Sequence, residues 1–473
     1  MKSILREGAA LPAAGTDLRR QYPLYILYNT KKWWPLLLIP VLRALFSPGD
    51  ALSILYASLR DVGLALLVVG WSAMKWDRAR YQLHNGLTLE QGLVVRRRLR
   101  LMADDAASIE VERTPLMALL GGRRVRVNTA GLRRRSDATI FLPARRARLF
   151  LPAGGRRRAG DYGARLLPVT AMAASSSNAA LGFLTLAPVI RQLGRILGER
   201  VPDQVYNAVE KVISLGLPPL LESVANLLVL GWVFSFVRTL LRYIGFYAQR
   251  EGARLHLVSG LITRRDVLID RWKITTLELR QTLFMRLLRL HTATITAAGY
   301  GRETGSRPVI VPGARVRELC AALDTLLPDY PICVSCLRPK RTALPRYLLP
   351  PLEMLALAAV PILLGGLWTM AAVLWGIGGL WWFFIRLQGF LHAGFGVGRG
   401  AVTLRYSRGL ALYEVHIPAE VADCVILTRS PWQVRSGTCN VEVRCFGEKR
   451  RRHRVLALPY DQARALVEKL ARE

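Results

Sequence analysis

The sequence lacks the motifs on which most enzyme active sites are built. Its six histidines are scattered over 473 residues, and no HExxH, GxSxG or Walker phosphate-binding pattern occurs. The lone Cys333-Val-Ser-Cys336 pair has no second pair and no downstream histidines, so it is not a zinc pattern. The glycine-rich run 394–400 follows an apolar segment, whereas a phosphate-binding loop joins a strand to a helix. We therefore expect a protein without enzymatic activity, metal or cofactor.

Two further features are missing. Residues 1–32 are polar and charged, without the apolar core and small-residue cleavage site of a removable signal peptide. Cysteine is scarce, and all six cysteines fall in segments that we expect to face the reducing cytosol. We expect no structural disulfide.

Acidic residues are also scarce, since 33 Asp and Glu stand against 67 Lys and Arg and give a net charge of +34. The excess is local: residues 75–158 contain 20 basic and 7 acidic residues, while 238–330 and 386–473 each contain 15 and 8. These segments alternate with apolar ones, so the positive-inside rule places them and both termini in the cytosol. Topology explains the charge, and because no nucleic-acid-reading module is present we expect no nucleic-acid partner.

Apolar runs come in three pairs. They cover residues 33–46 with 53–74, 178–197 with 212–237, and 347–364 with 367–385. Most approach the ~20 residues that a helix needs to cross the hydrocarbon core of a membrane. The runs predict about six transmembrane helices arranged as three hairpins.

An internal repeat links the basic segments. Gly92–Gly131 and Gly260–Gly299 align without a gap at an offset of 168 residues, and Val125–Pro143 aligns with Val441–Pro459 at an offset of 316. Within each copy, apolar and polar residues alternate as in β-strands. Helical patterns follow at 314–327 and 460–471, and a degenerate, arginine-rich one at 144–150. In the third copy Ser407 stands where we expect the turn glycine.

The glycine turn, the paired arginines and the closing Thr-Ala-Gly or Ala-Ala-Gly step resemble the bacterial pleckstrin-homology-like (PH-like) domain of YdbS/YdbT-type membrane proteins. The resemblance covers the whole order of hairpin and domain. It implies an α+β membrane protein in which three hairpins alternate with three small PH-like β-barrel or sandwich domains, each with a C-terminal helix that is degenerate in the first. The expected segments are a cytosolic lead segment 1–32, hairpin 33–74, domain 75–160, hairpin 178–237, domain 245–330, basic linker 331–346, hairpin 347–385 and domain 392–473.

Two groups of residues are candidate sites. The recurring basic residues, which would hold anionic lipid headgroups or a partner, are Arg96, Arg97, Arg98, Arg123, Arg124, Arg264 and Arg265. Alternatively, these arginines only form a solvent-exposed strand face and contribute to the topology signal, without binding a ligand. Charges within the predicted helices, which are costly unless paired, are Arg43, Asp61, Arg191, Arg195 and Glu222. We expect Glu222 to pair with Arg191 or Arg195 across the second hairpin.

These features predict a non-catalytic inner-membrane protein. Its cytosolic domains would act as binding or scaffolding modules for a protein partner or an anionic membrane surface, within an envelope-associated complex. The alternative is a transporter or lipid-handling component that uses the charges of the second hairpin and the Pro218-Pro219 break.

Overall fold

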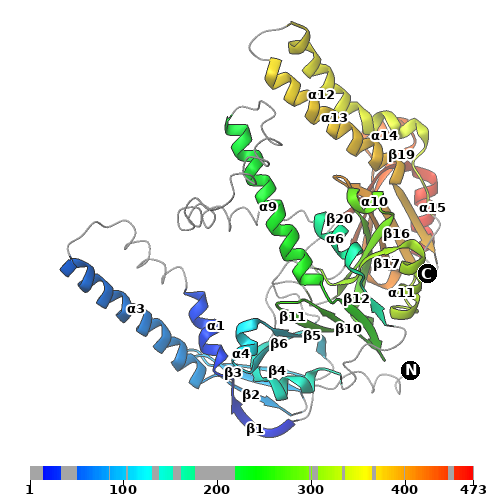
Figure 1. The fold of residues 1–473 in the computed structure, drawn as a ribbon. Coiled ribbons are helices and arrows are strands. Elements are labelled where there is room, and N and C mark those ends of the chain that lie inside the picture. Colours follow the sequence, from blue (N-terminus) through cyan, green and yellow to red (C-terminus); the bar gives the residue numbers. More distant parts are fainter. Residues whose placement is uncertain are drawn as a thin grey trace. The chain divides into compact units, whose positions relative to one another are not determined.

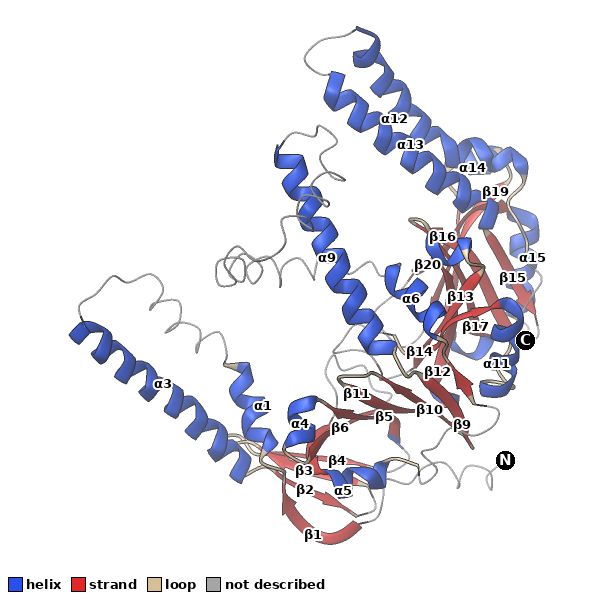
Figure 2. Ribbon diagram, viewed as in Figure 1, coloured by secondary structure: helices blue, strands red, loops and turns tan. Residues whose placement is uncertain are grey.

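A computed structural model describes residues 14–33, 51–84, 86–102, 105–129, 138–152, 161–175, 219–297, 300, 307–332, 336–364, 369–398, 400–445 and 452–471. The chain falls into two compact units. The first comprises Met1–Asp161, Gln249–Lys273 and Ala297–Ser306, and the second Tyr162–Ala248, Ile274–Thr296 and Arg307–Glu473. Long helices and antiparallel sheets build both units (Figure 2), which confirms the predicted α+β class.

Unit 1 begins with a sheet of order β1-β2-β3-β4. Its strands are β1 (Ala14–Arg20), β2 (Arg80–Leu83), β3 (Leu87–Gln91) and β4 (Arg97–Leu101). Helices α1 (Leu24–Lys32) and α3 (Ala51–Asp77) lie between β1 and β2 in sequence, and α3 projects from this sheet (Figure 1). The segment 1–32, to which the sequence analysis assigned no element, therefore contains a strand of the first repeat.

A second sheet of unit 1 contains strands from two repeats in the order β7-β6-β5-β11-β10. They are β5 (Ala106–Arg113), β6 (Gly122–Thr129), β7 (Ala138–Pro143), β10 (Arg254–Ser259) and β11 (Arg264–Asp270). The core lies between the two sheets and consists of alternating apolar strand residues such as Leu87, Leu89, Val125 and Ile140. Leu268 of the second repeat also contributes to this core.

Unit 2 has a sheet of order β14-β13-β12-β17-β16-β15, in which the second and third repeats join in the same way. The strands are β12 (Ile274–Gln281), β13 (Leu290–Ala297), β14 (Val309–Arg315), β15 (Gly394–Gly398), β16 (Ala401–Arg408) and β17 (Ala411–Pro418). A further sheet, β18-β19-β20, completes the third repeat with β18 (Ala422–Thr428), β19 (Thr438–Cys445) and β20 (Arg452–Pro459). A short strand, β8 (Tyr162–Gly163), pairs with the start of β9 (Tyr247–Glu251).

The predicted repeat is confirmed element by element. A short helix follows the strands β5, β12 and β18: α4 (Pro115–Leu119), α10 (Leu283–Leu287) and α14 (Pro431–Arg435). Between the first two copies, each strand and short helix of this segment is displaced by the expected 168 residues. In the third copy Ser407 pairs with Leu412 inside the hairpin, and Gly409, with a φ of 59°, forms the turn instead. The expectation that Ser407 replaces the turn glycine was wrong, because β16 extends further than β3.

The C-terminal helices also follow the prediction. They are α11 (Val316–Leu326) and α15 (Tyr460–Leu470), whereas the first repeat has only α5 (Ala144–Ala147) and a 3₁₀ turn, Arg148–Phe150. Leu319, Leu323 and Leu326 of α11 are buried at helical spacing.

Four long helices coincide with predicted membrane segments: α3, α9 (Pro219–Tyr243), α12 (Leu344–Leu364) and α13 (Thr369–His392). Helices α12 and α13 form a hairpin (Figure 1). Another helix, α6 (Leu166–Ala174), contacts α9. Among the described residues one helical stretch, Arg341–Pro361, is long and apolar enough to cross a membrane. The predicted segments 33–46 and 178–197 lie outside the described residues, apart from Trp33, and the scheme of six membrane helices stays a prediction.

Candidate functional site

Each short helix between the strands presents apolar side chains to solvent. In α4 and its C-terminal residue, Leu116, Leu119 and Leu120 are 50%, 83% and 47% exposed. Phe284 and Leu287 of α10 are 51% and 83% exposed. In a water-soluble surface such clusters are unusual, and they mark sites for protein or membrane contact.

The third repeat has the same arrangement with different residues. Trp432 and Val434 of α14 are 73% and 56% exposed, and the Arg435 guanidinium lies 5.8 Å from the Trp432 ring centroid. We call the exposed apolar residues of α4, α10 and α14, together with Leu120 and Leu288 that directly follow α4 and α10, the apolar tips.

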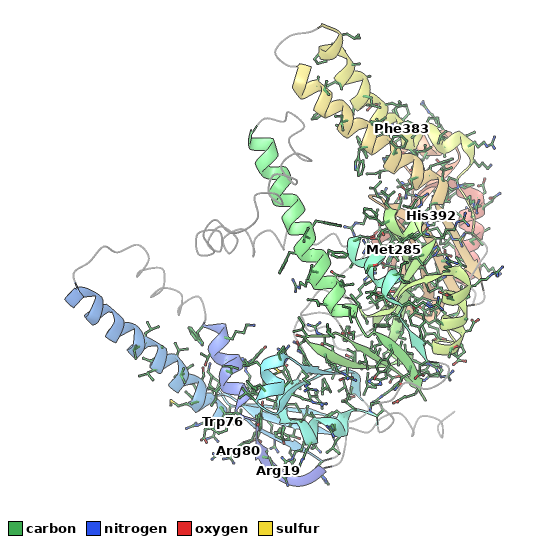
Figure 3. All side chains as sticks on the ribbon, in the orientation of Figure 1. Arg19, Trp76, Arg80, Met285, Phe383 and His392 are labelled. Carbon is green, nitrogen blue, oxygen red and sulfur yellow. The ribbon has the colours of Figure 1, made fainter. Side chains whose placement is uncertain are left out.

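Buried residues hold α10 and α14 in place, and side-chain caps hold α4 and α14. Met285 of α10, labelled in Figure 3, is buried against Ala171 and Leu290. Gln433 occupies the equivalent position in α14 and donates a hydrogen bond to Asn440 at 2.8 Å. Thr114 and Ser430 cap α4 and α14, because each side-chain oxygen accepts from a backbone N–H of the first turn. The exposed apolar residues are therefore displayed by ordered helices.

Every short helix is hydrogen-bonded, at its first or last turn, to a segment that leads into a predicted membrane helix. The Tyr22 hydroxyl, just before α1, donates to the carbonyl of Leu120 at 2.7 Å. Thr282, which precedes α10, donates to the Ser175 hydroxyl at 2.6 Å, directly after α6. Arg346 at the start of α12 donates to Ser430 at 2.9 Å. In all three repeats a hydrogen bond therefore joins the short helix, at its first or last turn, to the segment that leads into a predicted membrane helix.

The turn between β3 and β4 of the first repeat lies at the end of the sheet from which α3 projects. Arg78, one residue past α3, donates to the carbonyl of Leu93 in this turn at 3.4 Å, and Val94 and Val95 are 84% and 67% exposed. The corresponding turn of the third repeat receives a hydrogen bond from Gln388 of α13 to the Leu410 carbonyl at 3.2 Å. Arg19, Trp76 and Arg80 mark the junction of α3 with the first sheet (Figure 3).

The predicted basic residues separate into two groups. Arg96, Arg97 and Arg98 are exposed beside Val94 and Val95, and Arg98 forms a solvent-exposed ion pair with Glu90 at 3.1 Å. Arg264 is likewise exposed. Their exposure is compatible with the predicted contact with an anionic surface, which stays a prediction.

Arg123, Arg124 and Arg265 are more deeply placed. Arg124 pairs closely with Glu112, and Arg265 lies 3.7 Å from the same carboxylate. Arg126 of β6, which the sequence analysis did not single out, bridges Glu110 and Glu112 at 3.2 Å each.

This ion cluster holds β5, β6 and β11 together. Burial acts to raise the pKa of Glu112, but its three arginine neighbours outweigh burial and hold the pKa below its ordinary value. Arg124 and Arg265 thus take part in ion pairs within unit 1, and their predicted role in binding an anionic headgroup stays a prediction. Alternation of Glu on β5 with Arg on β6 was visible in the sequence, but their pairing required the strand register.

The predicted intramembrane pair stays a prediction. Glu222 lies on α9 and Asp61 on α3, and Arg43, Arg191 and Arg195 are outside the described residues.

Among the described residues no group of three or more His, Cys, Asp or Glu side chains forms a potential metal site. Of the polar residues that the first two repeats share, Thr114 caps α4, and Glu110 and Glu278 form ion pairs with arginines. The described surface with the strongest common pattern is thus the set of apolar tips.

Comparison with known proteins gives a family match. A model described as the bacterial PH domain matches residues 35–150 and 205–327, which span the first and second repeats. The UPF0699 transmembrane protein YdbT of Bacillus subtilis (strain 168) is 21% identical over 315 residues, covering 60% of this chain and 63% of that protein. The chain thus spans less than two thirds of that relative. No solved structure matches.

Proposed function

The chain belongs to the bacterial PH domain family of membrane proteins, and on that premise we propose that it is a non-catalytic protein whose apolar tips insert into the surface of the membrane that its helices cross. The tips and the adjacent arginines would hold three tandem domains flat against the cytosolic face of the inner membrane, as a scaffold. The observation that carries this proposal is the position of the tips: the residue just after α4, or the residue just before α10 and α14, is hydrogen-bonded to the segment entering a predicted membrane helix.

The energies favour insertion. Fully burying a leucine or phenylalanine side chain gives about 1.5–3 kcal/mol, and each first- and second-repeat tip exposes at least three such residues. Arginine near an anionic surface adds about 1 kcal/mol per charge. Arg96, Arg97 and Arg98 supply such charges beside the first tip. Because the helices already tether the domains to the membrane, little further entropy is lost when the tips insert.

A label that reports its environment tests the proposal. Leu119→Cys and Val434→Cys would each carry an environment-sensitive fluorophore, in the full chain with the exposed Cys320 and Cys424 changed to Ser, reconstituted into nanodiscs that contain anionic lipid. The matched control is Met102→Cys: Met102 is 61% exposed at the opposite end of β4.

We expect the tip labels to shift to shorter emission wavelength and to be quenched by lipid-attached quenchers, and the Met102 label to remain as in water. Equal emission and equal quenching at Leu119 and Met102 would show that the tips stay in solvent. Because the quenchers are attached to lipid, quenching of a tip label reports contact with lipid and not contact with a protein.

A further inference from the structure

Strand pairing between successive repeats follows one rule. In unit 1, β11 pairs antiparallel with β5 so that Val267 lies opposite Glu110. In unit 2, β17 pairs antiparallel with β12 so that Val415 lies opposite Glu278. Glu110 and Glu278 occupy the same position of the repeat. Every pair in the second junction corresponds to a pair in the first, so the two junctions share one register.

Two strands occupy junction positions without a junction partner. β4 corresponds to β11 and β17 but lies at the edge of its sheet, and β18 corresponds to β5 and β12 and is also an edge strand. Within the described residues neither strand has a neighbour on its outer side. The missing neighbour leaves residues of β18 more exposed than their equivalents in β5. Ser108 and Glu110 of β5 are 2% and 5% exposed, whereas Cys424 and Ile426, at the same positions of β18, are exposed and half-buried.

The two edge strands, β4 and β18, differ in length, hydrophobicity and charge. β18 is seven residues long and apolar at its centre, Cys424-Val-Ile-Leu427, and an unprotected apolar edge of this kind is a template for another strand. β4 is short and carries Arg97, Arg98 and Arg100. Arginines on an edge oppose pairing with a second basic strand. β18 has no basic residue, and its one charged residue is Asp423, so its charge is opposite to that of β4.

We propose that copies of this chain associate head to tail by pairing β18 of one copy with β4 of the next, in the register of the two internal junctions. That register places Ile426 opposite Leu99 and Thr428 opposite Arg97. Ile426 replaces the acidic residue of the internal junctions, and Leu99 replaces Val267 or Val415, so the pair is apolar on both sides. A second copy is the fitting occupant because it provides the one described strand that matches this junction and lacks a partner. The two surfaces differ, so the association is heterologous and can extend beyond a dimer.

Disulfide trapping tests the register. Two differently tagged full-length copies, one with Arg97→Cys and the other with Thr428→Cys, would be co-expressed with Cys320 and Cys424 changed to Ser, and oxidised in native membranes. Residues directly opposite in antiparallel strands have Cβ atoms about 4.5–5.5 Å apart, close enough for a disulfide after small adjustment. We expect a product containing both tags. The control replaces Arg97→Cys by Arg98→Cys, whose side chain points to the other face, and should give little product.

Three outcomes decide the proposal. Absence of a product containing both tags, with each copy monomeric in detergent and in membranes, would overturn it. A disulfide formed only within one chain when both cysteines are placed in the same copy would overturn the second-copy assignment. Ile426→Lys should abolish the mixed product by placing a charge against Leu99 and Arg97, whereas Trp432→Lys, which alters only an apolar tip, should leave it. The trapping result is thus independent of whether the tips insert into the membrane.

Discussion

Removal of Glu112 tests the ion cluster that joins the first two repeats. The Glu112 side chain is 5% exposed and faces Arg124, Arg126 and Arg265, whose side chains are 13%, 10% and 23% exposed. Glu112→Ala leaves three guanidinium groups with Glu110 as the remaining carboxylate of the cluster. Removing one partner of a buried ion pair costs about 3–5 kcal/mol, because the other charges stay buried without compensation.

A matched control lies in the same repeat. Glu90 pairs with Arg98 at 3.1 Å, but these side chains are 36% and 68% exposed. Exposed pairs contribute about 0–1 kcal/mol. Glu90→Ala should therefore cost at most about 1 kcal/mol, although it removes the same charge from an adjacent sheet.

The assay is thermal unfolding of the full chain in detergent, followed by fluorescence. A unit of this size shifts its melting temperature by roughly 2–4 °C per kcal/mol. We expect a decrease of roughly 6–20 °C for Glu112→Ala and at most about 4 °C for Glu90→Ala. Equal shifts for the two variants would refute the claim that the cluster holds the repeats together.

Three further predictions follow from individual groups. Since the pKa of Glu112 is depressed in the folded state, the stability that the Glu112 carboxylate contributes to the fold should be complete above its ordinary pKa of 4.5. That contribution should be lost as the pH falls through the pKa of the folded state. Glu112→Gln should abolish this acid-dependent component of the melting temperature. Burial raises the pKa of Cys439 to about 11, so at neutral pH iodoacetamide should alkylate the exposed Cys424 in monomeric protein and spare Cys439 until unfolding, as mass spectrometry would show. Reporter fusions after each repeat domain should all read as cytosolic; a periplasmic signal at any one would contradict the positive-inside assignment.

Much of the fold could be read from the sequence because it depends on local pattern. Alternation of apolar residues identified the strands, and the helical spacing of Leu319 and Leu323 identified α11. Self-comparison fixed the repeat offset that the strands then followed. β1 could not be identified in this way, because residues 14–20 have little apolar alternation and form a strand only by pairing with β2.

For the candidate sites, the sequence revealed which residue types are present but not what surrounds them. Pairs of arginines were visible in the sequence, but Arg97 and Arg265 occupy the same position of the repeat, and only Arg265 has a carboxylate, that of Glu112, opposite it in the sheet. The apolar tips were visible as leucines and a tryptophan, which a sequence reading would place in the core. Their exposure results from short helices that bury only one side, at Met285 and Gln433.

The sequence by itself determined the three repeats, their alternation with apolar segments, and the excess of positive charge on the repeats, since each depends on the order of residue types along the chain. Only the tertiary structure decided how neighbouring repeats join. A strand edge has the same backbone donors and acceptors whatever its sequence, so pairing of β5 with β11 and of β12 with β17 is set by which edges the folded repeats bring together. The same physics leaves β4 and β18 as edges within the described chain.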